Sequence, residues 1–206
     1  MEKLMLVNGS PRAPRSNTKK YLELFRTFWG AGADEYLVTA RAHREACAGL
    51  EGYTDLLLAF PLYADGLPVT LMAFLKELRQ HDLARKPTIH VLINCGFLEP
   101  EQNQVAVDMV RLFCAQNGFA FGSVLQVGSG EAILGTPFAF LVKGKLKKLA
   151  RAIRTGRPGV WRVTMPLPKK TFLGASTRYW VNYGAQNGIT REQMDTMEIE
   201  GGPADR

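Results

Sequence analysis

The sequence predicts an α/β domain built on a doubly wound, five-stranded parallel sheet with the strand order 2-1-3-4-5. Short apolar segments alternate with longer helical patterns through the first three quarters of the 206 residues. Residues 4–7, 56–60 and 89–93 are almost continuously apolar, as expected for strands covered on both faces. A helical pattern follows each strand, and crossovers this short favour the five-stranded order over a larger dinucleotide-binding sheet.

The expected elements follow from the periodicity of the apolar residues. The strands are Lys3–Asn8, Asp34–Val38, Asp55–Phe60, Thr88–Cys95 and Ala120–Val127. The helices are Asn17–Trp29, a short one at His43–Leu50, one that begins at Pro68, then Glu101–Gln116 and Phe138–Thr155. Proline suits the first position of a helix because its ring fixes φ and its missing N–H needs no partner there.

Two helices have an apolar stripe that predicts which side chains face the core. Offsets of three, four and seven residues place one face of the first helix together: Tyr21, Leu22, Phe25, Phe28 and Trp29. In Glu101–Gln116 the same rule selects Val105, Met109, Leu112 and Phe113. Gly118 is a plausible terminator of that helix because glycine readily adopts a left-handed conformation.

The sequence divides into a domain at residues 1–157 and a C-terminal extension at residues 158–206. Val160–Met165 reads as a further extended segment, Thr171–Gln186 as a helix, and Arg191–Met197 as a short helix capped by Thr190. From Gly201 the chain is expected to fray. Because the extension has too few apolar residues for its own core, we expect it to pack on the domain or on a partner subunit.

Composition and charge narrow the function classes. The chain is 46% hydrophobic and 22% charged, so it can build a substantial core. Its net charge of +7 would attract an anionic cofactor. The basic segments of this sequence contain no known nucleic-acid-binding motif in which aromatic and basic residues are interleaved, so no nucleic-acid partner is expected. No segment approaches the ~18 consecutive apolar residues of a membrane span, so no membrane partner is expected.

The three cysteines predict a reducing compartment and no metal centre. Cys47, Cys95 and Cys114 are far apart, with no C-x-x-C pair and no metal-ligand spacing. The odd count, together with an N-terminus that leads directly into a strand, favours free thiols in the cytoplasm.

The turn between the first strand and the first helix predicts an anion site. The strand runs into Gly9-Ser10-Pro11-Arg12, and the helix opens with Ser16-Asn17-Thr18. The first N–H groups of a helix have no internal acceptor and carry the positive end of its dipole, so they can hold a phosphate. Gly9 would let the backbone approach a ligand. The alternative is that Ser16 or Asn17 merely caps the helix.

Two further turns belong to the same predicted rim, because ligands bind beyond the carboxyl ends of the strands in such sheets. After the third strand, the turn at residues 60–68 contains Tyr63, which can lie against a flat ring. After the fourth strand, the turn offers Asn94 as donor and acceptor, Gly96 for close backbone approach and Phe97 as an apolar wall. Each turn alone could instead be an ordinary structural turn.

The motifs of the first two turns resemble those of the NADPH-dependent FMN reductase family and its flavodoxin-like relatives, with the iron–sulfur flavoprotein branch the most similar. The resemblance covers about residues 3–155 and implies a flavodoxin-like fold, a dimer and bound FMN. It implies that the FMN phosphate is held by Ser10, Arg12, Ser16, Asn17 and Thr18. It implies that the isoalloxazine ring is bordered by Pro61, Leu62, Tyr63, Asp65 and Gly66, and closed on its far side by Asn94, Cys95, Gly96 and Phe97.

The chain departs from this pattern in two places. It lacks the compact cysteine cluster of the iron–sulfur flavoproteins, so no Fe–S centre is expected. The turn after the fourth strand lacks the run of glycines seen in many reductases and carries Glu99 instead, which leaves the electron donor open.

The leading hypothesis is an FMN-dependent oxidoreductase that takes hydride from NADPH or NADH and passes reducing equivalents to a small acceptor such as a quinone or a flavin. We name no catalytic side chain, because hydride transfer between stacked rings needs no side-chain acid or base. The alternatives are an FMN-binding electron carrier or redox sensor without its own nicotinamide turnover, and a basic module that binds a polyanion.

Overall fold

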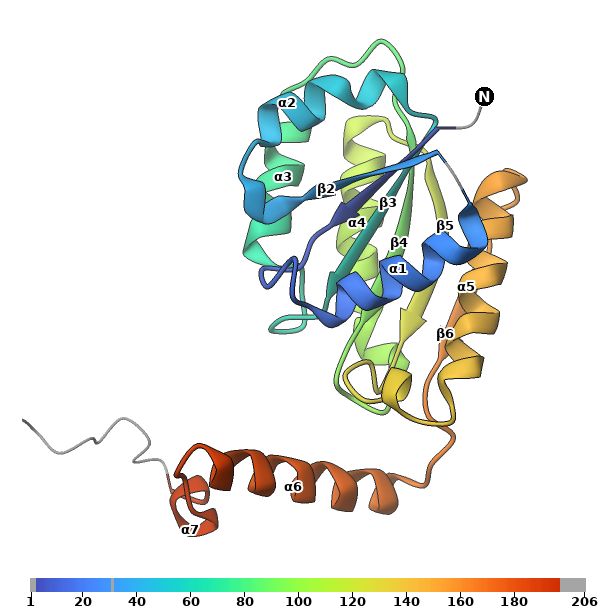
Figure 1. The fold of residues 1–206 in the computed structure, drawn as a ribbon. Coiled ribbons are helices and arrows are strands. Elements are labelled where there is room, and N and C mark those ends of the chain that lie inside the picture. Colours follow the sequence, from blue (N-terminus) through green and yellow to red (C-terminus); the bar gives the residue numbers. More distant parts are fainter. Residues whose placement is uncertain (1–2, 31, 197–206) are drawn as a thin grey trace, which may run out of the picture. The chain divides into compact units, whose positions relative to one another are not determined.

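A parallel sheet of six strands organises residues up to Met165 in the computed structural model, which describes residues 3–30 and 32–196 (Figure 1). The strand order is β2-β1-β3-β4-β5-β6. The strands are β1 (Leu4–Asn8), β2 (Ala33–Leu37), β3 (Asp55–Pro61), β4 (Thr88–Asn94), β5 (Phe121–Val127) and β6 (Val160–Val163). The predicted order 2-1-3-4-5 is therefore confirmed, but the predicted count of five strands is wrong by one.

The sixth strand lies within Val160–Met165, which the sequence predicts to be extended but not to join the sheet, because it is a short edge strand. β6 has four residues and is half exposed along most of its length, so it has no continuous apolar run. It pairs with β5 from Val124↔Val160 to Val127↔Val163. The Arg162 guanidinium adds a hydrogen bond of 2.7 Å from Nε to Oε1 of the buried Gln126. The sheet is thus extended by backbone pairing and one polar contact.

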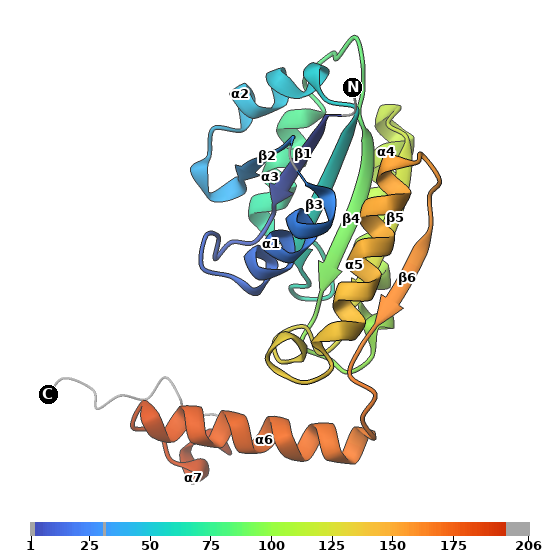
Figure 2. The same ribbon diagram turned by 45° about the vertical axis from the view of Figure 1, so that its right-hand side comes forward.

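The helices cover both faces of the sheet (Figures 1 and 2). The helices α1 and α5 pack against each other on one face, and α2, α3 and α4 contribute to the hydrophobic core on the other. Their bounds are α1 Asn17–Trp29, α2 His43–Ala48, α3 Val69–Leu78, α4 Gln104–Asn117 and α5 Ala139–Arg154. Short 3-10 turns lie at Val38–Ala40, Gly49–Gly52, Pro100–Asn103 and Ile133–Gly135.

Helix α1 forms where the sequence predicts it. Ser16 is the N-cap, and its Oγ accepts a hydrogen bond of 3.2 Å from the backbone N–H of Lys19. Gly30, at φ 87°, ends the helix and donates its N–H to the carbonyl oxygen of Arg26. Of the predicted stripe, Phe28 is partly exposed and the others are buried. Burying a large apolar side chain stabilises the fold by about 1.5–3 kcal/mol.

Helix α4 faces the core with a different side from the predicted one. Val105 and Leu112 are each 58% exposed, so their assignment to the core is wrong, while Met109 and Phe113 pack at the margin of the core. The buried side chains of α4 are smaller: Ala106, Val107, Val110 and Cys114. The small side chains face the core, and Val105 and Leu112 lie towards solvent.

A second compact unit begins at Pro166, and its described residues, up to Thr196, form two helices, α6 (Lys169–Gln186) and α7 (Arg191–Met194). Thr190 caps α7 in a capping box: its Oγ1 accepts from the N–H of Gln193, whose side chain accepts from the N–H of Thr190. The predicted end of the last helix at Met197 and the frayed tail from Gly201 lie outside the described residues. No helix in the described part of the chain is long and apolar enough to cross a membrane.

Candidate functional site

A cavity of about 480 Å³ opens at the carboxyl ends of the central strands. The register brings these ends together, since Asn8 pairs with Ala59, and Pro61 pairs with Asn94. The cavity is lined by the start of α1 and by the loops after β1, β3, β4 and β5. Its size lies within the range of about 300–1,000 Å³ that is usual for cofactor sites.

Most of the residues predicted for the site meet in this cavity. Its lining includes Ser10, Arg12, Ser16, Asn17, Thr18, Pro61, Leu62, Tyr63, Asn94, Cys95 and Gly96. Asp65, Gly66 and Phe97 are not part of the lining. The loops that contain these three residues reach the cavity through their first residues only.

The start of α1 presents hydroxyl and amide donors to the cavity. Ser10 is buried, and its Oγ accepts a hydrogen bond of 3.2 Å from the N–H of Arg12, which fixes the turn after β1. The N–H groups of Asn17 and Thr18 belong to the first helical turn, where no intrahelical acceptor is available. This end of the cavity can therefore bind an anion through backbone and side-chain donors together.

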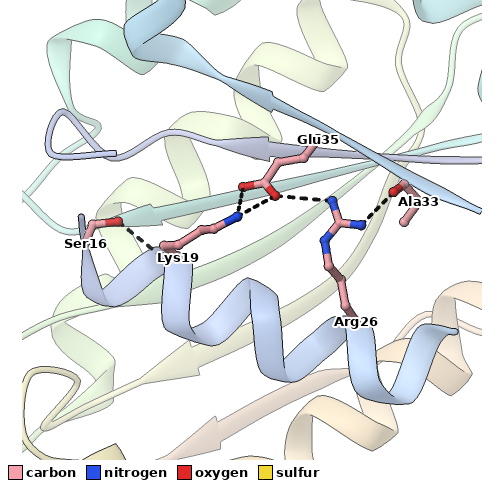
Figure 3. A network of polar contacts seen from close by, with 5 residues as sticks. All are labelled: Ser16, Lys19, Arg26, Ala33 and Glu35. Atoms are coloured by element: carbon pink, nitrogen blue, oxygen red, sulfur yellow. Dashed lines mark hydrogen bonds and ion pairs between the residues drawn. The ribbon is translucent and has the colours of Figure 1, made fainter. Parts of the chain in front are cut away.

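Four basic side chains line the same end of the cavity, but they differ in the polar contacts that they make. Arg12, Arg15 and Lys20 are exposed at the cavity, and Lys20 Nζ lies 3.1 Å from Oδ1 of Asn17. Lys19 instead points to Glu35 on β2, with Nζ 2.9 Å from Oε2 (Figure 3). Glu35 also accepts from Arg26, so this carboxylate fastens α1 to the edge strand rather than serving the cavity.

Asn94 joins three of the lining segments. Its Nδ2 donates to Thr18 Oγ1 and to the carbonyl oxygen of Phe60, both at 3.2 Å. The backbone carbonyl oxygen of Asn94 accepts a hydrogen bond of 2.8 Å from the backbone N–H of Leu62. Asn94 is buried, so these bonds are shielded from water and would be costly to leave unmade. The residue holds the helix start and the loop after β3 in a fixed relation.

The loop after β3 is a tight hairpin that presents Tyr63. The N–H groups of Tyr63 and Gly66 donate to each other's carbonyl oxygens. Between them, Ala64 and Asp65 adopt φ values of 46° and 56°, a left-handed pair that is unfavourable for alanine. The Tyr63 side chain is 43% exposed at the cavity, where its ring can lie against a flat ligand.

The loop after β5 is a fourth contributor to the cavity, beyond the three turns that the sequence predicts. It places Glu131 in the lining, close to Gly96. Gly130 lies so near the loop after β4 that a Cβ would sit 2.9 Å from Asn94 Cβ, and its carbonyl oxygen accepts from the Tyr21 hydroxyl at 2.7 Å. The spaced glycines of this segment were a usable signal for close packing beside the site.

The surroundings of Gly9 and Cys95 indicate structural roles: Gly9 is packed against core side chains, and the Cys95 thiol is buried. A Cβ on Gly9 would come within 3.0 Å of Leu71 Cδ2 and Phe60 Cβ, so this glycine makes room for core side chains. Burial raises the pKa of the Cys95 thiol, and Asn103 Nδ2 donates to its sulfur. The thiol is therefore protonated at neutral pH and poorly nucleophilic. Among the described residues, no cluster of His, Cys, Asp or Glu side chains could hold a metal ion.

The sheet order defines a flavodoxin-like fold, and its cavity lies at the start of α1. No protein-family model and no curated protein matches the sequence. Solved structures do match the fold. One is an NADH:FMN oxidoreductase (EMOB) in its apo form, which is 19% identical, with a TM-score of 0.60 over 76% of this chain and 90% of that one.

Two further solved structures are FMN or quinone enzymes by their descriptions. The NAD(P)H:quinone oxidoreductase from Methanothermobacter marburgensis is 11% identical, with a TM-score of 0.58 over 74% of this chain and 96% of that one. The FMN-dependent NADH-azoreductase from Bacillus anthracis str. Ames Ancestor, solved in complex with FMN, is 11% identical, with a TM-score of 0.57 over 74% and 99%. At these identities the likeness establishes the fold.

Proposed function

We propose that the protein is an FMN-dependent NAD(P)H oxidoreductase that passes reducing equivalents to a small acceptor such as a quinone or a flavin. The observation that carries the proposal is the cavity itself, which combines anion-binding donors at the start of α1 with an aromatic side chain after β3. The flavin and quinone enzymes among the structural neighbours support it.

The lining residues fit the two chemically different parts of FMN. A phosphate matches the Ser16 hydroxyl, the N–H groups of Asn17 and Thr18, and the positive charge of Arg12. A flat, largely apolar ring matches the opposite end, where Tyr63 and the backbone at Gly96 line the cavity. FMN would supply hydride acceptance and electron transfer there, and the protein would bind and orient it.

The proposed enzyme acts as a homodimer in the cytoplasm. The three cysteines are free and buried, which fits a reducing compartment.

The proposal is tested by titrating the purified chain with FMN and following flavin fluorescence, and then measuring NADH and NADPH oxidation with a quinone present. We expect micromolar or tighter binding and steady turnover. Replacing Ser16 and Asn17 together by alanine should weaken FMN binding roughly 10- to 100-fold, since a hydrogen bond to a charged group contributes about 1.5–3 kcal/mol.

Asn117→Ala is the matched control, because Asn117 caps the far end of α4 and is not part of this cavity. A chain that binds no FMN would contradict the proposal. FMN binding without any oxidation of NADH or NADPH would instead identify an electron carrier or redox sensor.

A further inference from the structure

Helix α6 carries a continuous aromatic stripe. Five apolar residues occupy a, d and g sites of two heptads, with Ser176 at the remaining d site: Phe172, Leu173, Tyr179, Trp180 and Tyr183. The rings of Tyr179, Trp180 and Tyr183 touch one another, with centroid separations of 5.2–6.3 Å. The aromatic residues therefore lie on one side of the helix.

Among residues 166–196, the part of the second unit that the structure describes, none buries this stripe. Leu173, Tyr179, Trp180 and Tyr183 are between 46% and 58% exposed, and Gly184 is the only buried residue of α6. Gly184 is where α7 packs, since a Cβ there would lie 2.9 Å from Met194 Sδ. The described residues 166–196 bury too little apolar surface to stabilise their two helices by themselves. Its stripe needs a further surface.

We propose that the α6 stripe binds the α6 stripe of a second copy of this chain, with the two helices antiparallel. This inference rests on the homodimer of the proposed function and names its interface, and its test is independent of FMN binding. An antiparallel pair with its two-fold axis at Arg178 places Ser176 opposite Trp180 of the second copy, and Leu173 opposite Tyr183. Each layer then combines a smaller side chain with a larger one. A parallel pair would place Trp180 against Trp180 and leave Ser176 facing Ser176.

The charges of the unit favour the same orientation. Helix α6 begins with Lys169 and Lys170 and contains no Asp or Glu, so two of its three basic residues lie at its start and the third, Arg178, lies at its middle. Its C-terminal end carries the negative end of the helix dipole, and Arg191, Glu192 and Asp195 follow in and after α7 with a net charge of −1. An antiparallel pair brings the basic start of each helix to the negative end of the other. A parallel pair brings like ends together.

The test is the mass of the full-length chain in solution, measured by sedimentation and by light scattering after gel filtration. We expect the wild type to be a dimer. Trp180→Ala with Tyr183→Ala should weaken the dimer at least ten-fold, and Ser176→Trp should weaken it by overfilling the layer opposite Trp180. Asn182→Ala, at an exposed position outside the stripe, is the matched control and should leave the mass unchanged.

The unfolding transition of the first unit, measured on every variant, separates dissociation from misfolding, because residues up to Met165 form a separate compact unit. A monomeric wild type would overturn the proposal. So would a dimer that persists when the stripe is truncated, because the stripe would then be covered by the first unit, by lipid or by another partner.

The orientation is tested by cysteine pairing, since the native cysteines are buried. An oxidised mixture of the Ser176→Cys and Trp180→Cys chains should give a covalent heterodimer. Preferential homodimers of the Ser176→Cys chain would indicate parallel helices and contradict the proposed arrangement.

Discussion

The two ends of the cavity recognise a ligand by different physical means. The α1 end, made of Ser10, Arg12 and Ser16–Thr18, offers hydroxyls, helix-start N–H groups and positive charge. The loop end, made of Pro61–Tyr63 and Asn94–Gly96, offers an exposed aromatic ring on a strained hairpin. The α1 end suits an anion and the loop end suits a flat ring. Binding of FMN, which has a phosphate, and riboflavin, which has none, should therefore respond differently to changes at each end.

The largest effect is expected where the two ends are joined. Asn94→Ala leaves Thr18 Oγ1 and the carbonyl oxygen of Phe60 without their donor in a buried setting. We expect the free energy of unfolding to fall by about 2–3 kcal/mol, measured by urea denaturation. FMN and riboflavin binding should both weaken, since both ends lose their alignment. An unchanged midpoint would show that the two ends are held together by other contacts.

A change confined to the α1 end should separate the two ligands. Arg12→Ala is expected to weaken FMN binding roughly 5- to 10-fold and to leave riboflavin binding unchanged, because only FMN has a phosphate. The difference should shrink at high salt, since Arg12 is exposed. Lys19→Ala is the control, because Lys19 is engaged with Glu35. Equal losses for both ligands in Arg12→Ala would place the phosphate elsewhere.

A change confined to the loop end should affect both ligands alike. Tyr63→Ala removes the ring that lines the cavity and should weaken FMN and riboflavin equally, by roughly 5-fold, the value of an aromatic contact of about 1 kcal/mol. Phe97→Ala is the matched control, since Phe97 is exposed and outside the lining. If riboflavin binding were insensitive to Tyr63→Ala, the ring would not lie at this end.

The smallest effect concerns the strain of the hairpin. Ala64→Gly removes a side chain from a left-handed position, and the relief should exceed the entropic cost of glycine by about 0.5–1 kcal/mol in the free energy of unfolding. Asp65→Gly should gain less, because aspartate tolerates this conformation better. A loss of stability in Ala64→Gly would mean that the hairpin is not strained at that residue.

The sequence by itself determined the elements and the rim. Continuous apolar runs identify buried strands, the stripe and cap of Asn17–Trp29 identify α1, and the rule that parallel strands end at one edge predicts that their turns meet. These features are local or follow from topology, so the order of the first five strands and most of the cavity lining could be read from the chain.

Only the tertiary structure decided the features that depend on contacts between distant segments. The edge strand β6 exists through pairing with β5, and the buried face of α4 is chosen by how closely small residues approach the sheet. Glu131 enters the cavity because the loop after β5 packs onto the loop after β4, and Gly9 serves Leu71 and Phe60 rather than a ligand. Such choices are made by packing across the fold, which periodicity along one segment does not encode.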